Sequence, residues 1–335
     1  MSIELTYNDF LLRDIKRYPI GLSDCGEDVN PEPGKCNNFN NRFKKNGPKK
    51  SDRRYGEAFP IYILQHNTVG TFQSTAATFI KNESPVSANY VIDKNGELYR
   101  FVSNTFRAYH AGSGSFTKNS CLSGLPYNEL EDEMNSWSFG IENVNSGNEP
   151  YTAEQIRTNV SVCQRLADEF STIDTNLMVG HSDWAPGRKI DPNPYFPWQQ
   201  FANAMDEPKF KDLSINKNFG IFPRKTELDL SDDPKIVIAW GKDNYELTQD
   251  GKSVQMCLQE YGYHIPETEL GKYGKATRNA LLSFQLHFFG EEILSNEFTK
   301  MDWENVYNGK NGTVLCTFNE NHQKCLDDIL DQFSK

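Results

Sequence analysis

The chain has 335 residues, a net charge of −11, and 37 % hydrophobic and 24 % charged residues. This length exceeds that of one ordinary hydrophobic core and predicts two domains with extensions. The acidic balance argues against nucleic acid as the main partner, because a phosphate backbone requires a basic surface. No apolar run approaches the roughly 18 residues that span a bilayer, so no transmembrane segment is expected.

Residues 1–57 are predicted to be an N-terminal extension made largely of loop. Its first twenty residues carry charges where a signal peptide has an uninterrupted apolar stretch. The protein is therefore expected either to be cytosolic or to have lost a leader. Cys25 and Cys36 could form a disulfide in an oxidising compartment, and the sequence leaves this open. None of the seven cysteines forms a C-x-x-C pair, which argues against a cysteine zinc site.

Strand and helix patterns alternate from about residue 58, which predicts an α/β or α+β layer domain over residues 58–205. "FPIYILQH" indicates a buried strand that ends in His66, and "TFQSTAATFIKN" indicates a helix. "ANYVIDKNGELYRFV" predicts a hairpin around an Asn95-Gly96 turn. In the strand "SFGIENV", Glu142 points away from its apolar neighbours, and Gly140 leaves that face open.

"YTAEQIRTNVSVCQRLADEF" predicts a helix that begins with a capping box of Thr152 and Gln155. A last strand, "LMVGH", delivers His181 into the segment "GHSDWAPGRKIDPNP". The prolines and the glycine of this segment exclude a long helix or a central strand, so we expect a shaped loop. The loop concentrates a histidine, two aspartates, an arginine and a lysine.

Residues 206–235 are charged and poor in apolar periodicity, which predicts a linker. Residues 236–335 contain three apolar stripes at helical spacing, with Gly262 as a C-terminal stop of the first. They predict a small all-α three-helix domain. The stripes are Val254, Cys257, Leu258 and Tyr261; Thr277, Leu281, Phe284 and Phe288; and Leu326, Ile329, Leu330 and Phe333. The segment 290–321 resembles an insertion before the last helix.

His66, His181 and Asp191 form the main candidate site, because two imidazoles and one carboxylate are three zinc ligands. An open fourth position is typical of a catalytic site, in which the ion activates water and polarises a carbonyl. The alternative is that each histidine is an ordinary hydrogen-bonded residue. The spacing matches no local metal motif and does not by itself decide between them.

Several segments resemble the zinc-dependent N-acetylmuramoyl-L-alanine amidases of the amidase_2 family, in their order and near their spacing. They are "IYILQHNTVG", "VSANYVIDKNGELYRFV", "RAYHAG", "SFGIENVN" and "VGHSDWAPGRKIDPNP". The resemblance covers roughly residues 58–203 and is most specific in the last segment. "VQMCLQEYGYHIPETELGKYGKATRNALLSFQLHF" resembles a three-helix peptidoglycan-binding module, and this combination is similar to the AmiD- and AmpD-like branch of the family.

The resemblance implies a mixed central sheet flanked by helices, with one Zn²⁺ per chain. It makes His66, His181 and Asp191 the zinc ligands. It places Glu142 on the catalytic glutamate, which moves a proton between water and the leaving amine. Lys189 falls on the catalytic lysine, which stabilises the oxyanion. The alternatives are a surface salt bridge for Glu142 and a solvated charge for Lys189.

Three further residues are implied as substrate contacts, namely His110, Tyr109 and Asn89. The family often has tryptophan at the position of Tyr109 and histidine at that of Asn89. Asp183 is implied to make loop hydrogen bonds rather than to bind the metal.

The implied function is hydrolysis of the amide between N-acetylmuramic acid and L-alanine in peptidoglycan or muropeptides, by a protein expected to be a monomer. A wall substrate and a wall-binding module imply work outside the cytoplasm, in the periplasm, at the outer membrane or after secretion. One alternative is a non-catalytic peptidoglycan-recognition protein of the same fold. Two others are a cytosolic recycling amidase and a secreted effector or lysin that acts on other cells.

Overall fold

The computed structural model of the chain describes ten ranges, which are 16–17, 60–80, 86–102, 104, 107–123, 134–173, 175–205, 228–238, 246–295 and 316–333. The Cys25–Cys36 pair, nearly all of the N-terminal extension and most of the linker lie outside these residues. The chain divides into two compact units. The first contains Met1–Gly112, Asp132–Val179 and Asn203–Phe219, and the second contains Ser113–Glu131, Gly180–Ala202 and Gly220–Lys335.

The sheet of the first unit is mixed, as the resemblance implied. Its strand order is β1-β4-β3-β5-β2-β6. The central strands β3, β5 and β2 run parallel, and β3 pairs antiparallel with β4. The strands are β1 (Lys16–Arg17), β2 (Tyr62–Asn67), β3 (Tyr90–Ile92), β4 (Leu98–Arg100), β5 (Ser138–Asn143) and β6 (Met178–Gly180). The hairpin predicted around Asn95-Gly96 is confirmed, with Gly96 at a φ of 78°.

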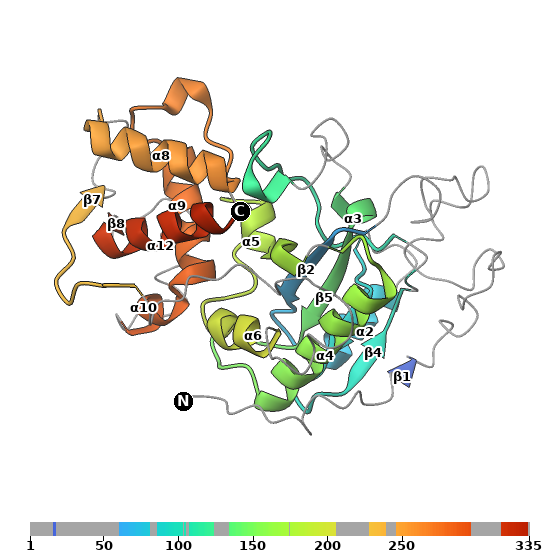
Figure 1. Cartoon of the computed structure of the whole chain (residues 1–335). Coiled ribbons are helices and arrows are strands. Elements are labelled where there is room, and N and C mark those ends of the chain that lie inside the picture. The colour runs from blue at the N-terminus through green and yellow to red at the C-terminus, as the bar shows by residue number, and fades with distance from the viewer. Residues whose placement is uncertain are drawn as a thin grey trace, which may run out of the picture. The chain divides into compact units, whose positions relative to one another are not determined.

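Helix α4 (Ala153–Glu169) covers one face of this sheet (Figure 1), where its Asn159 side chain bonds to residues of β2 and β5. The predicted capping box of Thr152 and Gln155 is present at its start. Its buried side meets the sheet through apolar contacts and through a polar network in which Asn159 bonds to Gln65 and Asn143. Because buried amides must be hydrogen-bonded, this network fixes the register between the helix and the two strands.

Helix α2 (Phe72–Ile80) belongs to a second cluster of the first unit, built on Phe72, Ala76, Phe79, Val91 and Phe101. Among the described residues before the linker, the other helical segments are η4 (Cys121–Ser123), α3 (Met134–Trp137), η6 (Thr175–Leu177), α5 (His181–Trp184) and α6 (Trp198–Met205). His181 therefore begins a single helical turn and does not end a strand, because β6 stops at Gly180.

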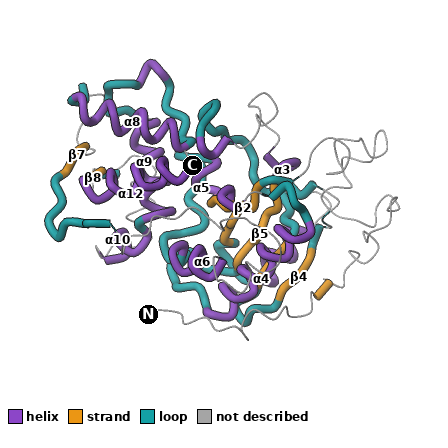
Figure 2. Tube along the Cα trace, in the orientation of Figure 1, coloured by secondary structure: helices purple, strands orange, loops and turns teal. Residues whose placement is uncertain are grey.

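The second unit contains the three predicted helices, α8 (Gln249–Tyr261), α9 (Lys275–Phe288) and α12 (Glu320–Phe333), with Gly262 capping α8. It is not purely helical, since β7 (Ile236–Ile238) pairs antiparallel with β8 (Phe318–Asn319), as the strand colouring of Figure 2 shows. It also has η7 (Glu267–Glu269) and α10 (Gly290–Ser295). Among the described residues, no helix combines the length and apolar character needed to cross a membrane.

Candidate metal centre

His66 and Glu142 lie side by side at the carboxyl ends of two parallel strands. They are register partners in the pairing of β2 with β5. Residues paired across neighbouring strands point to the same face of the sheet, so both side chains lie on the face opposite α4. His66 is 1 % exposed, and the Oε2 atom of the half-buried Glu142 is itself buried. The predicted ligand and the predicted proton carrier therefore meet at the edge of the sheet where α/β proteins bind their ligands.

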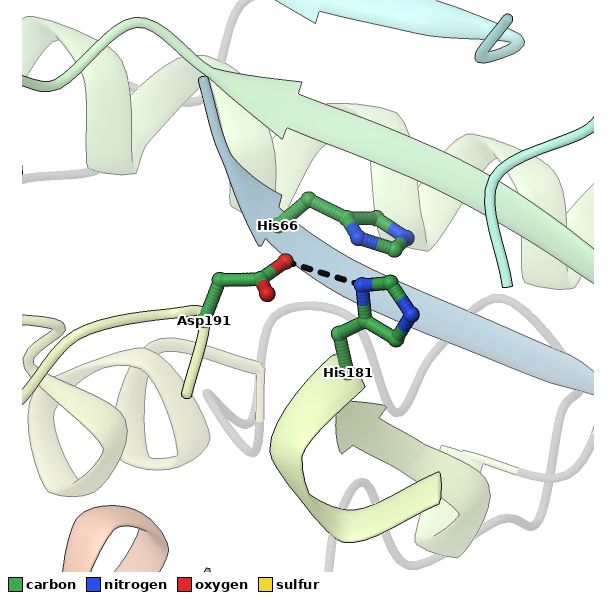
Figure 3. A group of neighbouring side chains, drawn as sticks. All are labelled: His66, His181 and Asp191. Carbon is green, nitrogen blue, oxygen red and sulfur yellow. Dashed lines mark hydrogen bonds and ion pairs between the residues drawn. The ribbon is translucent and has the colours of Figure 1, made fainter. Parts of the chain in front are cut away.

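His181 and Asp191 come from the loop that the sequence singled out. Nδ1 of His181 lies 3.0 Å from Oδ2 of Asp191, and the loop is closed by the Ser182 amide, which donates to the Asp191 carbonyl at 2.8 Å. One nitrogen or oxygen atom from each of His66, His181 and Asp191 lies within 4.8 Å of the other two (Figure 3). The three residues predicted as ligands are thus brought together.

A chain of hydrogen bonds fixes the tautomer of His66. The single hydroxyl hydrogen of Ser138 points to the carbonyl oxygen of Met134 at 2.6 Å, so Ser138 Oγ accepts from His110 Nε2 at 3.4 Å. With its proton on Nε2, His110 accepts at Nδ1, which lies 3.0 Å from Nε2 of His66. His66 therefore donates from Nε2 and presents the lone pair of Nδ1 to an ion, an arrangement typical of metal-binding histidines.

Gly140 makes room for the His110 ring. A Cβ atom on Gly140 would stand 2.4 Å from Cγ of His110. The face that the sequence predicted to be open at Gly140 is therefore filled by an imidazole, not by solvent. The Gly140 amide also donates to Oδ1 of Asn89 at 3.2 Å, and Asn89 is fully buried.

The three predicted substrate contacts differ in their surroundings. Tyr109 is 7 % exposed and belongs to the hydrophobic cluster under α2, with the Arg107 guanidinium 5.4 Å from its ring centre. Asn89 and His110 flank Gly140. These contacts organise the fold around the site, and the substrate-binding role of all three residues stays a prediction.

Lys189 and Arg188 are held by the backbone of the loop. The amides of both residues donate to the carbonyl of Ala185 at 3.0 Å, and Lys189 is half-buried. The Arg188 side chain donates from Nε to the Ser113 carbonyl at 2.8 Å and lies 3.4 Å from Nε2 of His181. Arg188 thus ties the ligand loop to a neighbouring segment.

The donor set fits a zinc ion. Two imidazoles and one carboxylate are the ligand types that Zn²⁺ takes in catalytic sites with three protein ligands. The 3.0 Å between His181 and Asp191 is close to the edge of about 3.4 Å of a tetrahedron with zinc at its centre. Two nearly buried histidines and one partly buried aspartate also provide the dry surroundings that such a site requires.

Comparison with known proteins agrees with this geometry. Residues 56–194 match the Amidase_2 family, described as N-acetylmuramoyl-L-alanine amidase. The match includes the three candidate ligands, Glu142 and Lys189. The helices α8, α9 and α12 lie beyond it, so their peptidoglycan-binding role is not part of the match.

Curated relatives cover different shares of the chain. The 1,6-anhydro-N-acetylmuramyl-L-alanine amidase AmpD of Enterobacter cloacae is 32 % identical over 129 residues, which are 38 % of this chain and 62 % of AmpD. AmpD of Haemophilus influenzae is 29 % identical over 36 % of this chain and 59 % of its own length. The chain thus matches less than two thirds of these relatives. The N-acetylmuramoyl-L-alanine amidase AmiD of Escherichia coli is 26 % identical over 73 % of this chain and 82 % of AmiD.

Solved structures share the fold. The complex of E. coli AmiD with anhydro-N-acetylmuramic acid-L-Ala-D-γ-Glu-L-Lys superposes with a TM-score of 0.57 at 22 % identity, over 82 % of this chain and 91 % of AmiD. AmpDh3 from Pseudomonas aeruginosa gives a TM-score of 0.55 at 16 % identity, over 86 % of this chain and 96 % of AmpDh3. The expected α/β fold with additional helices is confirmed.

Proposed function

We propose that the protein is a zinc-dependent N-acetylmuramoyl-L-alanine amidase, which hydrolyses the amide between N-acetylmuramic acid and L-alanine. The observation that carries this proposal is the group of His66, His181 and Asp191, with Glu142 in register beside His66. The group lies within the Amidase_2 match, and the AmpD and AmiD relatives carry the same activity in their names.

Each residue has a role that follows from its chemistry. His66, His181 and Asp191 would hold one zinc ion, which when bound supplies a Lewis acid and brings the pKa of water to about 7. Glu142 takes a proton from the attacking water and returns it to the leaving amine of L-alanine. Lys189 places its ammonium beside the carbonyl oxygen, on which negative charge develops in the tetrahedral intermediate.

Substrate class and location are part of the same proposal. The AmpD relatives are named for 1,6-anhydro muropeptides, and the AmiD structure holds an anhydromuropeptide. We propose that this chain accepts such muropeptides and also the intact wall, with residues 236–335 attaching to peptidoglycan and raising the local substrate concentration. The protein would then act as a monomer outside the cytoplasm, in the periplasm, at the outer membrane or after secretion.

Digestion of purified sacculi tests the activity. Zinc-loaded protein, chelated protein and the Glu142→Gln and Lys189→Met variants are compared, with products analysed by mass spectrometry. The matched control is Glu149→Gln, which removes a carboxylate whose side chain is 35 % exposed and is paired with Lys94. We expect free stem peptides that begin at L-alanine from the wild type and the control. Loss of the proton carrier should slow the reaction about 10²- to 10⁴-fold, and loss of the oxyanion contact about 10²- to 10³-fold.

The outcomes separate the alternatives. Intact sacculi and intact anhydromuropeptides with every preparation, but protein that sediments with the wall, would identify a recognition protein without catalysis. Cleavage of soluble anhydromuropeptides but not of sacculi would identify a recycling enzyme. Residues 230–335 belong to the second unit. If added soluble muropeptide abolishes sedimentation of the full-length protein, this would argue against a separate wall-binding surface in these residues.

A further inference from the structure

One face of α9 carries polar side chains where a packed helix normally carries apolar ones. Asn279, Ser283 and His287 follow one another at intervals of four residues, so they lie along the same side of the helix. All three are buried, at 8 %, 2 % and 6 % exposure. Because buried polar groups are unfavourable without hydrogen bonds, this stripe needs polar partners.

The ligand loop supplies such partners for Ser283 and His287. Ser283 Oγ donates to the Ser182 carbonyl at 2.8 Å. Nδ1 of His287 lies 2.7 Å from Oδ2 of Asp183, so the imidazole donates to the carboxylate. Asn279 lies directly against Gly187, where a Cβ atom would come within 1.9 Å of the Asn279 amide nitrogen. The loop therefore lies along the polar stripe of α9 over its length from Ser182 to Gly187.

Asp183 is the centre of this contact. Its carboxylate has no exposed surface and accepts from three donors, which are the Gly180 amide, the Tyr263 hydroxyl and the His287 imidazole, each at 2.7 Å. The bond to Gly180 closes the turn in which His181 stands. Hydrogen bonds to a buried carboxylate are strong, and each one lost leaves charge uncompensated.

The two side-chain donors, Tyr263 and His287, are themselves fixed. The His287 ring stacks on Trp198 with 3.9 Å between ring centres and 22° between the planes. Burial, and after it the charge of Asp183, keeps the pKa of Tyr263 well above its ordinary value, so the hydroxyl retains its proton and donates. Neither donor can turn away without losing a packed ring contact or leaving Asp183 short of a bond.

We propose that α9 and Tyr263 are positioning elements of the metal centre, which hold His181 in place through Asp183. Tyr263 and α9, which lie beyond the Amidase_2 match, are then required for metal binding, in addition to any attachment to the wall. The inference rests on the proposed function for the presence of a metal ion. It also predicts that the loop is rigid when no metal is bound. His287 and Tyr263 act through Asp183 and are positioning residues, not catalytic ones.

Full-length Tyr263→Phe and His287→Phe variants test this inference, because each removes one donor and keeps a ring. The matched control is His322→Phe. His322 is a buried histidine of the same unit, paired with Glu292 at 2.8 Å. Zinc affinity is measured by competition with a chromophoric chelator. Hydrogen exchange of residues 180–191 and the urea midpoint are measured on chelated protein.

We expect both test variants to bind zinc about 10- to 100-fold more weakly, in the range found when partners of metal ligands are removed. Their 180–191 amides should exchange faster in chelated protein. His322→Phe should lower the urea midpoint and leave zinc affinity and this exchange unchanged. Wild-type zinc affinity and wild-type exchange in Tyr263→Phe would overturn the inference, as would equal weakening in His322→Phe. A wild type that binds no zinc refutes the proposed function, whereas the exchange result still decides the role of α9.

Discussion

Replacing Gly140 by alanine is the sharpest test of how the first unit prepares His66. The new Cβ would stand 2.4 Å from Cγ of His110, and carbon atoms in contact need about 3.5 Å or more. The ring would therefore have to move by about 1 Å. Its bond to His66 is 3.0 Å long, so such a displacement takes it beyond hydrogen-bonding distance.

The expected effect on stability combines two contributions. Inserting one methyl group into a packed site lowers the free energy of unfolding by about 1–3 kcal/mol. Loss of one hydrogen bond between buried rings adds about 1 kcal/mol. We therefore expect Gly140→Ala to lower the stability of chelated protein by about 2–4 kcal/mol. Zinc affinity should fall about 10-fold or more, because His66 loses the acceptor that fixes its tautomer.

Urea unfolding of chelated protein and chelator competition for zinc measure the two effects separately. Gly251→Ala is the matched control, since its Cβ would stand 2.7 Å from Cγ2 of Ile238 in the second unit. It should reduce stability and leave zinc affinity unchanged. In the double variant Gly140→Ala/His110→Ala the clash is absent, so stability should recover relative to Gly140→Ala while zinc binding stays weak.

The refuting result is specific. A Gly140→Ala protein with wild-type zinc affinity would mean that the His110 ring does not support His66. Equal stability of Gly140→Ala and wild type would mean that the ring does not occupy the space above Gly140.

Three further predictions concern the same unit. Ser138→Ala removes the acceptor that keeps the proton on Nε2 of His110, so zinc affinity should fall several-fold and the urea midpoint should change little; an unchanged affinity would contradict the hydrogen-bond chain. Val69 has a φ of 50°, which is unfavourable by about 1–3 kcal/mol for a β-branched residue. Val69→Asn should accordingly raise the free energy of unfolding by about 1 kcal/mol in urea titrations, and a lower value would show that no strain is stored there. The Lys94 ammonium, and after it the Ser146 amide, lower the pKa of Glu149 from 4.5 to about 2. A carboxyl group with a lowered folded pKa stabilises the fold fully above its unfolded pKa, and this contribution is lost as the pH falls from about 4.5 towards 2. The difference in thermal midpoint between wild type and Glu149→Gln should therefore be constant above pH 5 and shrink on acidification, and a difference independent of pH would argue against the Lys94 pair.

Local sequence determined the elements whose signals lie within a few residues. The capping box at Thr152, the turn at Asn95-Gly96 and the stop at Gly262 all follow from side-chain or backbone preferences of neighbouring residues, and each is found in the structure. The three candidate ligands were reached differently. Their spacing gave no local motif, and it was the resemblance of whole segments that distinguished His66, His181 and Asp191 from ordinary histidines and aspartates.

Predictions from the sequence were wrong where a feature depends on a contact with a residue that is distant in the chain. Gly140 indicated an open face, but His110, thirty residues earlier in the chain, fills it. The C-terminal region indicated helices alone, yet β7 and β8 pair across some eighty residues. His181, the first residue of α5, was expected to be the last residue of a strand, because the apolar run before it leads directly to the histidine.

Only the tertiary structure shows which residues hold the candidate metal ligands in place. The interval of four between Asn279, Ser283 and His287 is visible in the sequence, but polar residues at that spacing are ordinarily the solvent-exposed side of a helix. Only the packing of α9 against the ligand loop buries this stripe and makes Ser283 and His287 donors to the loop. The periodicity of the sequence predicts which side chains share a face of a helix. Whether the α9 side chains are buried, and which groups they bond to, depends on residues about a hundred positions away. The sequence thus identified the candidate metal ligands, and the fold decided which groups hold them in place.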